Sequence, residues 1–161
     1  MRLLLIIIGI WLLSACSSAP EPIATPFQLT LSSDGLINPY QDNDANPVVL
    51  RLYQLRDEQA FKQASYIELY HNDNQVLAKD LVSKQLLAPF LPARELSMTL
   101  DIHRDSRFIA VFAEFANYQD SQASTVIALP ETAEQRLFLN ISGNTVLLTS
   151  QEKKKPWWSV F

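Results

Sequence analysis

The sequence predicts a mainly β protein that folds as a two-sheet β-sandwich, and two kinds of segment support this prediction. Residues 48–55 and 108–115 are apolar at nearly every position, as expected of strands that are covered on both faces. Residues 137–141 and 146–148 alternate instead, and the Gly143-Asn144 step between them favours a hairpin. With the other alternating runs, this gives about seven or eight strands in an immunoglobulin-like arrangement.

The first strand is expected at residues 27–31, where apolar and polar side chains alternate. Residues 32–46 then form a predicted loop that is rich in Ser, Asp, Gly, Asn and Pro. It begins with Ser33-Asp34-Gly35 and ends with Asn46-Pro47, two turn-forming sequences that indicate a shaped loop. Loops of this length inside a compact domain are usually functional or disordered. This one leads directly into the central strand.

Two short helices are predicted after the central strand, at residues 57–64 and 66–71. Asp57 and Ser65 are suitable N-cap residues for them, and the helices would cover one face of a sheet. Residues 76–81 fit no single element. Further strands are expected at four places before the hairpin: residues 82–89, 96–103, 108–115 and 125–129.

The N-terminus has the pattern of a bacterial lipoprotein signal. Residues 3–13 are apolar, but they are too few to span a bilayer, which needs about 20 residues. Leu13-Ser14-Ala15-Cys16 matches the lipobox, in which the cysteine becomes the lipidated first residue of the mature chain. Cys16 is the sole cysteine, so an internal disulfide cannot form. The competing interpretation is an ordinary signal peptide cleaved after Ala15.

These patterns divide the chain into four parts. We expect a lipoprotein signal peptide at residues 1–15, a lipidated flexible tether at 16–26, the β-sandwich domain at 27–150 and a basic, aromatic tail at 151–161. Three prolines favour an extended tether, and lipid on Cys16 would anchor the domain to a membrane. The lysines and tryptophans of the tail fit either a membrane-surface contact or an edge of the fold.

Composition and motifs argue against several classes of function. A net charge of −4 and a pI near 5.1 argue against a nucleic-acid partner. The two histidines are too few for a zinc site, and Asp42 with Asp44 supplies only part of a calcium loop. The sequence has neither a glycine-rich phosphate loop nor a nucleophile elbow. We therefore expect that the protein is not an enzyme and that it has no metal site and no cofactor beyond the covalent lipid on Cys16.

Glu114 is the one carboxylate in the apolar segment 108–115. A buried carboxylate needs a partner, and Arg51 on the other two-faced strand is the candidate. Otherwise, Glu114 faces an edge of the sheet.

The predicted loop is the candidate binding surface. Leu36, Ile37 and Tyr40 are apolar residues that belong to no expected strand, and they lie among acids and amides. They either fold back onto the edge of the sandwich or act as the apolar anchors of a protein interface with a polar rim. The contact residues expected under the second interpretation are Leu36, Ile37, Asn38, Pro39, Tyr40, Gln41 and Asp42.

Residues 38–55, with the sequence NPYQDNDANPVVLRLYQL, carry a resemblance to a known family. In order, they are followed by Phe61, Ala64, the Leu69-Tyr70 pair and the segment RFIAVFAEF at 107–115. Together with the lipobox, this set resembles the outer-membrane lipoproteins of type VI secretion, the TssJ (SciN, VasD) family. The resemblance spans residues 27–130.

This resemblance implies a fold, a location and a partner. The fold would be a transthyretin-like sandwich with helices inserted after the second strand. The chain would be anchored by its lipid to the periplasmic face of the outer membrane, and Ser17 after the cysteine fits such sorting. The loop between the first two strands would dock the periplasmic C-terminal domain of TssM, the inner-membrane subunit of the secretion machine.

A second class of function stays open, namely a periplasm-facing lipoprotein that binds a glycan or small ligand. Glycan sites usually combine exposed aromatic side chains with carboxylates or amides. The sequence alone shows only one aromatic pair that would suit such a site, Trp157-Trp158 in the tail.

Overall fold

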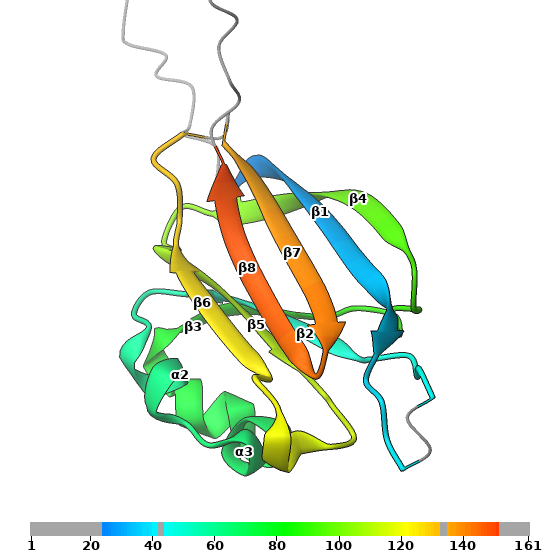
Figure 1. Cartoon of the computed structure of the whole chain (residues 1–161). Helices are drawn as coiled ribbons and strands as arrows, with labels where there is room; N and C mark the ends of the chain where they lie inside the picture. Colours follow the sequence, from blue (N-terminus) through cyan, green and yellow to red (C-terminus); the bar gives the residue numbers. More distant parts are fainter. Residues whose placement is uncertain (1–23, 42–43, 133–134, 152–161) are drawn as a thin grey trace, which may run out of the picture.

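The computed structural model describes residues 24–41, 44–132 and 135–151, which form a two-layer β-sandwich (Figure 1). One sheet has the strand order β4-β1-β7-β8 and the other β3-β2-β5-β6. Two helices, α2 and α3, follow β2, so the predicted mainly β sandwich with two inserted helices is confirmed. The elements are β1 (Ala24–Ile37), β2 (Leu50–Leu55), α2 (Gln59–Gln63), α3 (Tyr66–Leu77), a 3-10 turn (Ala78–Asp80), β3 (Leu81–Leu86), β4 (Glu95–His103), β5 (Phe108–Ala113), a 3-10 turn (Tyr118–Asp120), β6 (Ser124–Ala128), β7 (Arg136–Gly143) and β8 (Thr145–Gln151).

Several expectations concern residues outside these ranges. The signal peptide, Cys16, most of the tether, Asp42 and residues 152–161 of the tail lie outside the described residues. Within the described ranges, no helix is both long enough and apolar enough to cross a membrane.

The core lies between the two sheets and is built from alternating side chains. In β1, Phe27, Leu29 and Leu31 are buried, while Gln28 and Thr30 lie on the solvent face beside residues of β4. Strand β7 pairs parallel to β1, and strand β4 pairs antiparallel on its other side. The inward residues of β7 and β8 that complete this layer are Leu137, Leu139, Ile141, Val146 and Leu148.

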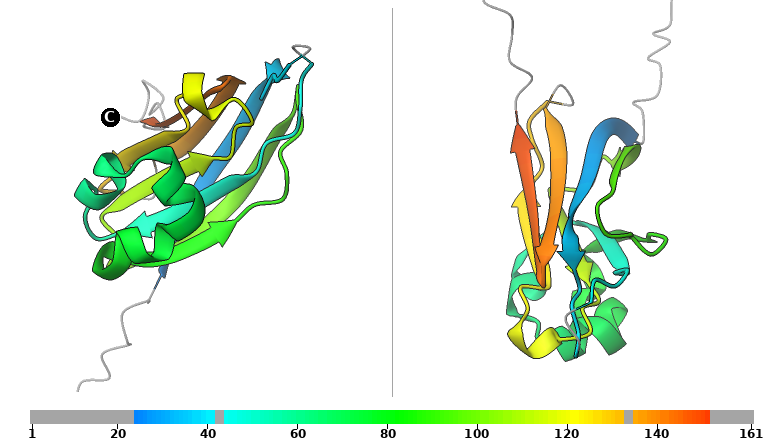
Figure 2. Two further views of the ribbon diagram at one scale, coloured as in Figure 1. Left: turned by 90° about the horizontal axis from the view of Figure 1, so that it is seen from below. Right: turned by 45° about the vertical axis from the view of Figure 1, so that its right-hand side comes forward.

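Strands β2 and β5 are covered on both faces, as their sequences predict. One face of this sheet packs against the other sheet, and α2 and α3 cover the opposite face (Figure 2). Leu52 is buried between the sheets, whereas Tyr53 packs against Phe61 of α2, with the ring centroids 5.7 Å apart. The absence of alternation in these apolar strands therefore reflects burial on both faces, by helices on one side and by a sheet on the other.

The first strand is longer than predicted, and this corrects the boundaries of the loop. Strand β1 continues from the expected residues 27–31 to Ile37, so the loop begins at Asn38 rather than Ser32. Ser32 pairs with Glu95 of β4 and with Asn140 of β7, and the register shifts between Ser33 and Ile37. Polar residues can continue a strand here because one face of this sheet is open to solvent.

The helical region also extends beyond its predicted end. Helix α3 runs to Leu77 rather than residue 71, because Leu69, Asp73 and Leu77 recur at four-residue spacing on its buried face. Asn72 has non-helical backbone angles and kinks the helix. Ser65 forms the expected cap, as part of a capping box with Glu68. Strand β3 then ends at Leu86, earlier than the expected residue 89.

The loop between β1 and β2 lies at the opposite end of the sandwich from the start of β1 (Figure 1). Strand β1 has 14 residues, so at roughly 3.3 Å per residue its two ends are separated by about 45 Å. The turn between β7 and β8 and the connection between β5 and β6 lie at the same end as the loop (Figures 1 and 2). We call this end, formed by residues 38–41, 44–49, 114–123 and 142–145, the distal end.

The core and the exposed end of β1 differ in burial, so substitutions in them should differ in their effect on the free energy of unfolding. The side chain of Leu52 is 1% exposed and that of Leu36 is 50% exposed. Leu52→Ala should lower the free energy of unfolding by about 2–5 kcal/mol, because it leaves a cavity. Leu36→Ala should cost less than about 1 kcal/mol. Chemical denaturation of both variants tests this, and equal losses would contradict the assignment of Leu52 to the core and of Leu36 to the exposed end of β1.

Candidate functional site

The loop of residues 38–49 is held in place by Asn38, which joins all three connections of the distal end. Its backbone N–H donates to the carbonyl of Gly143 at 2.9 Å, and its Nδ2 donates to the carbonyl of Pro47 at 2.8 Å. Its Oδ1 accepts from the N–H of Ala116 at 2.8 Å. Asn38 has a φ of 49°, a left-handed conformation that asparagine tolerates better than most residues.

A second asparagine closes the loop from its other side. The backbone N–H of Asn46 donates to the carbonyl of Ile37 at 2.9 Å. Its Nδ2 donates to the carbonyls of Asn38 and Asp44 at 3.2 and 2.8 Å. Tyr40 and Asp44 also form an antiparallel bridge. Polar bonds therefore hold the described part of the loop between Asn38 and Asn46, and the side chain of Tyr40 there faces solvent.

The structure divides the expected contact residues into two groups. Leu36 and Tyr40 are each 50% exposed, Gln41 is exposed and Pro39 is partly buried. Ile37 and Asn38, in contrast, are buried, so their side chains add no exposed surface to the loop. Ile37 pairs with Gly143 at the end of β1 and belongs to the core, while Asn38 serves as the tie described above.

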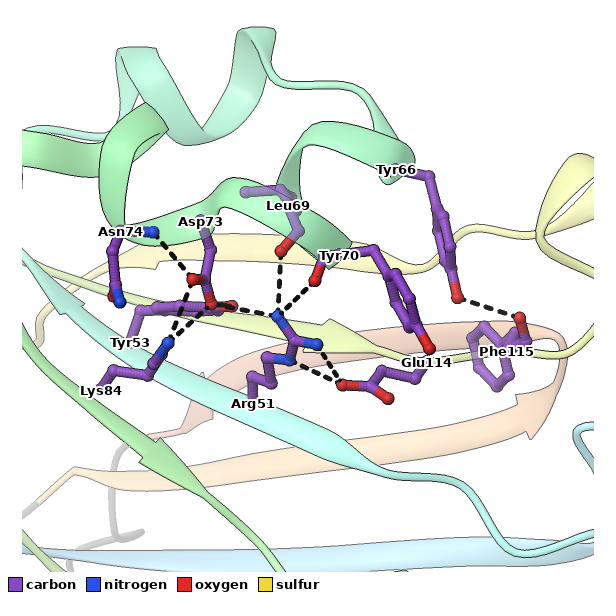
Figure 3. Close-up of polar contacts among 10 residues, drawn as sticks. All are labelled: Arg51, Tyr53, Tyr66, Leu69, Tyr70, Asp73, Asn74, Lys84, Glu114 and Phe115. Carbon is purple, nitrogen blue, oxygen red and sulfur yellow. Dashed lines mark hydrogen bonds and ion pairs between the residues drawn. The ribbon is translucent and has the colours of Figure 1, made fainter.

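A charged cluster lies between the sheet and helix α3, around Arg51 of β2 (Figure 3). Nη1 of Arg51 donates to the carbonyls of Leu69 and Tyr70 at 3.0 and 3.1 Å. These carbonyls stand just before the kink at Asn72, where helical hydrogen bonding is interrupted. Arg51 therefore stabilises the kinked helix and fixes it on the sheet.

Two carboxylates neutralise Arg51. Nε and Nη2 both lie 2.6 Å from Oε1 of Glu114, which confirms the pairing of Arg51 with Glu114 that the sequence suggested. Nη1 lies 3.1 Å from Oδ2 of Asp73. Sequence reasoning missed Asp73, because the predicted helix ended at residue 71. Two features of the sequence could have indicated it. Asp73 lies four residues after Leu69, on the same helix face, and a buried hydroxyl such as that of Tyr53 needs a hydrogen-bond partner.

Asp73 is buried and fully bonded within the cluster. Its carboxylate accepts from the Tyr53 hydroxyl at 2.8 Å and from Nζ of Lys84 at 3.0 and 3.1 Å. Burial favours a higher pKa for Asp73, but the hydrogen bonds from Tyr53, Lys84 and Arg51 outweigh it and hold the pKa below the ordinary value. Burial and the bond to Asp73 also raise the pKa of the Tyr53 hydroxyl. The cluster is therefore a structural link between α3, β2 and β3.

The lowered pKa of Asp73 makes stability depend on pH. An aspartate in the unfolded chain has a pKa of about 3.9, so the stabilisation is complete above that pH and is lost as the pH falls through the folded pKa. Asp73→Asn should cost about 3–5 kcal/mol at pH 7, because it removes the charged partner of Lys84 and one of the two charged partners of Arg51. The variant should then lose less stability than the wild type between about pH 5 and pH 2.

Denaturant titration across this pH range measures the difference. Glu131→Gln, at an exposed position, is the matched control and should follow the wild type. Parallel curves for the wild type and Asp73→Asn would contradict the assignment.

Comparison with solved structures places the fold among secretion proteins. The lipoprotein TssJ1 of Pseudomonas aeruginosa matches with a TM-score of 0.74 and 22% identity, over 81% of this chain and 98% of that one. Serratia marcescens Lip, a membrane-bound component of the type VI secretion system, matches with a TM-score of 0.71 and 18% identity, over 81% and 100%. A chain in a structure described as the "T6SS protein TssM C-terminal domain" from EAEC matches with a TM-score of 0.62 and 22% identity, over 77% and 97%.

At these identities, the structural matches establish the fold and not the function. Comparison with curated proteins found no match. The family described as "Type VI secretion lipoprotein, VasD, EvfM, TssJ" matches residues 25–144, which is most of the chain. This match confirms the resemblance seen in residues 38–55, and the chain belongs to the type VI secretion lipoprotein family.

Proposed function

We propose that this chain is the outer-membrane lipoprotein of a type VI secretion membrane complex, and that its β1–β2 loop docks the periplasmic domain of TssM. The observation that carries the proposal is the loop itself. Its described residues are tied into shape by Asn38 and Asn46, and two side chains, Tyr40 in the loop and Leu36 at the end of β1, are half exposed. Two findings support the choice of partner: the family match, and the similarity to a chain in a structure described as the TssM C-terminal domain.

The chemistry of the loop suits a protein interface. Tyr40 and Leu36 provide apolar anchors, and Gln41 adds a polar rim. A loop that is held in one shape before binding loses less conformational entropy on binding, which favours affinity. The hydrogen bonds of Asn38 to three separate connections provide this preorganisation.

The position of the loop agrees with anchoring through Cys16. The described domain begins at Ala24, at the end of the sandwich opposite the loop (Figure 1). A lipid on Cys16, eight residues earlier, would hold that end towards the membrane. The loop would then point away from the outer membrane into the periplasm, towards an inner-membrane partner.

Tyr40→Ala should weaken binding to the periplasmic domain of TssM by about 30-fold or more, because a tyrosine in a partner pocket is often worth more than about 2 kcal/mol. Titration calorimetry of the detergent-solubilised chain measures the affinity. Leu147→Ala is the matched control, since Leu147 is 55% exposed and lies on β8, away from the loop. Unchanged affinity in Tyr40→Ala, with an intact fold, would move the interface elsewhere.

Cys16→Ser tests the lipid anchor separately. The lipobox assigns Cys16 as the sole acylated residue, so the variant should no longer take up labelled palmitate or fractionate with outer membranes. Ser14→Ala, which keeps the cysteine in place, is the control. Continued palmitate labelling of Cys16→Ser would contradict the lipobox assignment.

A further inference from the structure

A hollow of about 380 Å³ lies between helix α3 and the connection that follows β5. Four of its lining residues are aromatic or apolar and come from α3 and the 3-10 turn, and a carboxylate lies beside them. These residues are Tyr66, Ile67, Tyr70, Tyr118 and Glu114. Neither the charged cluster nor the β1–β2 loop explains this concave surface.

Three tyrosines with stacked, nearly parallel rings line the hollow. The ring of Tyr66 lies 5.9 Å from that of Tyr70 with an angle of 12° between the planes, and 4.8 Å from that of Tyr118 with an angle of 20°. Tyr66 is fixed by its hydroxyl, which donates to the carbonyl of Phe115 at 3.0 Å, and by its contact with Phe112. Tyr70 and Tyr118 remain 41% and 40% exposed, so the stack presents aromatic surface to solvent.

Glu114 provides an oriented hydrogen-bond acceptor beside these rings. Arginine–carboxylate pairs frequently use both carboxylate oxygens. Here Nε and Nη2 of Arg51 both converge on Oε1, and Oε2 has no bonding partner among the described residues (Figure 3). The salt bridge fixes the carboxylate and leaves one oxygen free to accept from a ligand.

The hollow continues into a longer groove. A second hollow of about 560 Å³ shares Tyr70, His71 and Glu114 with the first and extends to Lys84 of β3. We call the two adjacent hollows, which meet at these shared residues, the groove; hydrogen-bonding groups line it at several points. An elongated ligand fits this shape better than a single compact ring does.

We propose that this groove binds a neutral, linear sugar chain. A pyranose ring has an apolar C–H face that packs on aromatic rings, and its hydroxyl groups donate to carboxylates. Other ligands suit the groove less well. Arg51 and Lys84 line the groove, but both are already paired with Glu114 and Asp73, so neither is free to hold an anion. A cation would need rings that surround it, whereas these rings lie against one another. An apolar helix would bury the Glu114 carboxylate without giving it a donor.

The sequence could not show this site because its parts are far apart in the chain. Tyr66 and Tyr70 lie in α3, and Glu114 and Tyr118 follow almost fifty residues later. Their combination of exposed aromatic side chains with a carboxylate meets the criterion for a glycan site. The inference does not depend on the docking of TssM.

Titration calorimetry tests the proposal with the full chain in a detergent that has no sugar head group. The probes are the tetramers of β-1,4-linked N-acetylglucosamine and of β-1,4-linked glucose, which together show whether the acetamido groups contribute. We expect saturable binding of at least one tetramer. Tyr118→Ala should weaken it by about tenfold, while Tyr118→Phe, which keeps the ring, should change it by less than about twofold. Tyr40→Ala should leave it unchanged.

Backbone NMR shifts of the wild-type chain provide a readout that does not rely on any variant. The tetramer should shift the signals of residues 66–71 and 114–118, and not those of Tyr40 and Gln41 in the β1–β2 loop. Failure of both tetramers to bind at millimolar concentration, or binding that shifts other residues, would overturn the proposal. Loss of TssM affinity in Tyr118→Ala without any sugar binding would also overturn it and would identify the groove as a protein contact.

Discussion

Arg51 brings a permanent positive charge into the layer between β2 and α3, and much of the structure follows from the need to pair that charge. A buried charge without partners is strongly destabilising, so the surrounding elements must supply acceptors. Helix α3 supplies Asp73 and the carbonyls of Leu69 and Tyr70, and the end of β5 supplies Glu114. The kink, the position of α3 and the free oxygen of Glu114 are consequences of this arrangement.

Asn38 solves a comparable problem at the distal end. Three connections meet there, and one asparagine satisfies backbone groups of all three. Tyr40 in the loop and Leu36 at the end of β1 lie outside the core and remain half exposed. A loop built in this way has apolar side chains available for a partner. The proposed docking function rests on this arrangement, in which polar side chains hold the loop and exposed apolar side chains are available to a partner.

The sequence predicted the parts of the fold that depend on local pattern. Strands covered on both faces, the Ser65 cap, the hairpin at Gly143 and the pairing of Arg51 with Glu114 could all be derived from residue types and spacing. The end of β1 could not, because its polar residues lie on a solvent-facing sheet, where strand and loop have similar composition. Asp73 and the tyrosine groove depend on long-range contacts, which a single sequence does not show.

The most direct test of the docking function is photocrosslinking in intact cells that produce the lipidated chain. A photoreactive phenylalanine derivative would replace Tyr40 in one strain and Leu147 in a second strain as the control. The account predicts a covalent adduct with TssM from position 40 and none from position 147. An adduct from position 147 alone, or no adduct from position 40 while the secretion complex assembles, would contradict it.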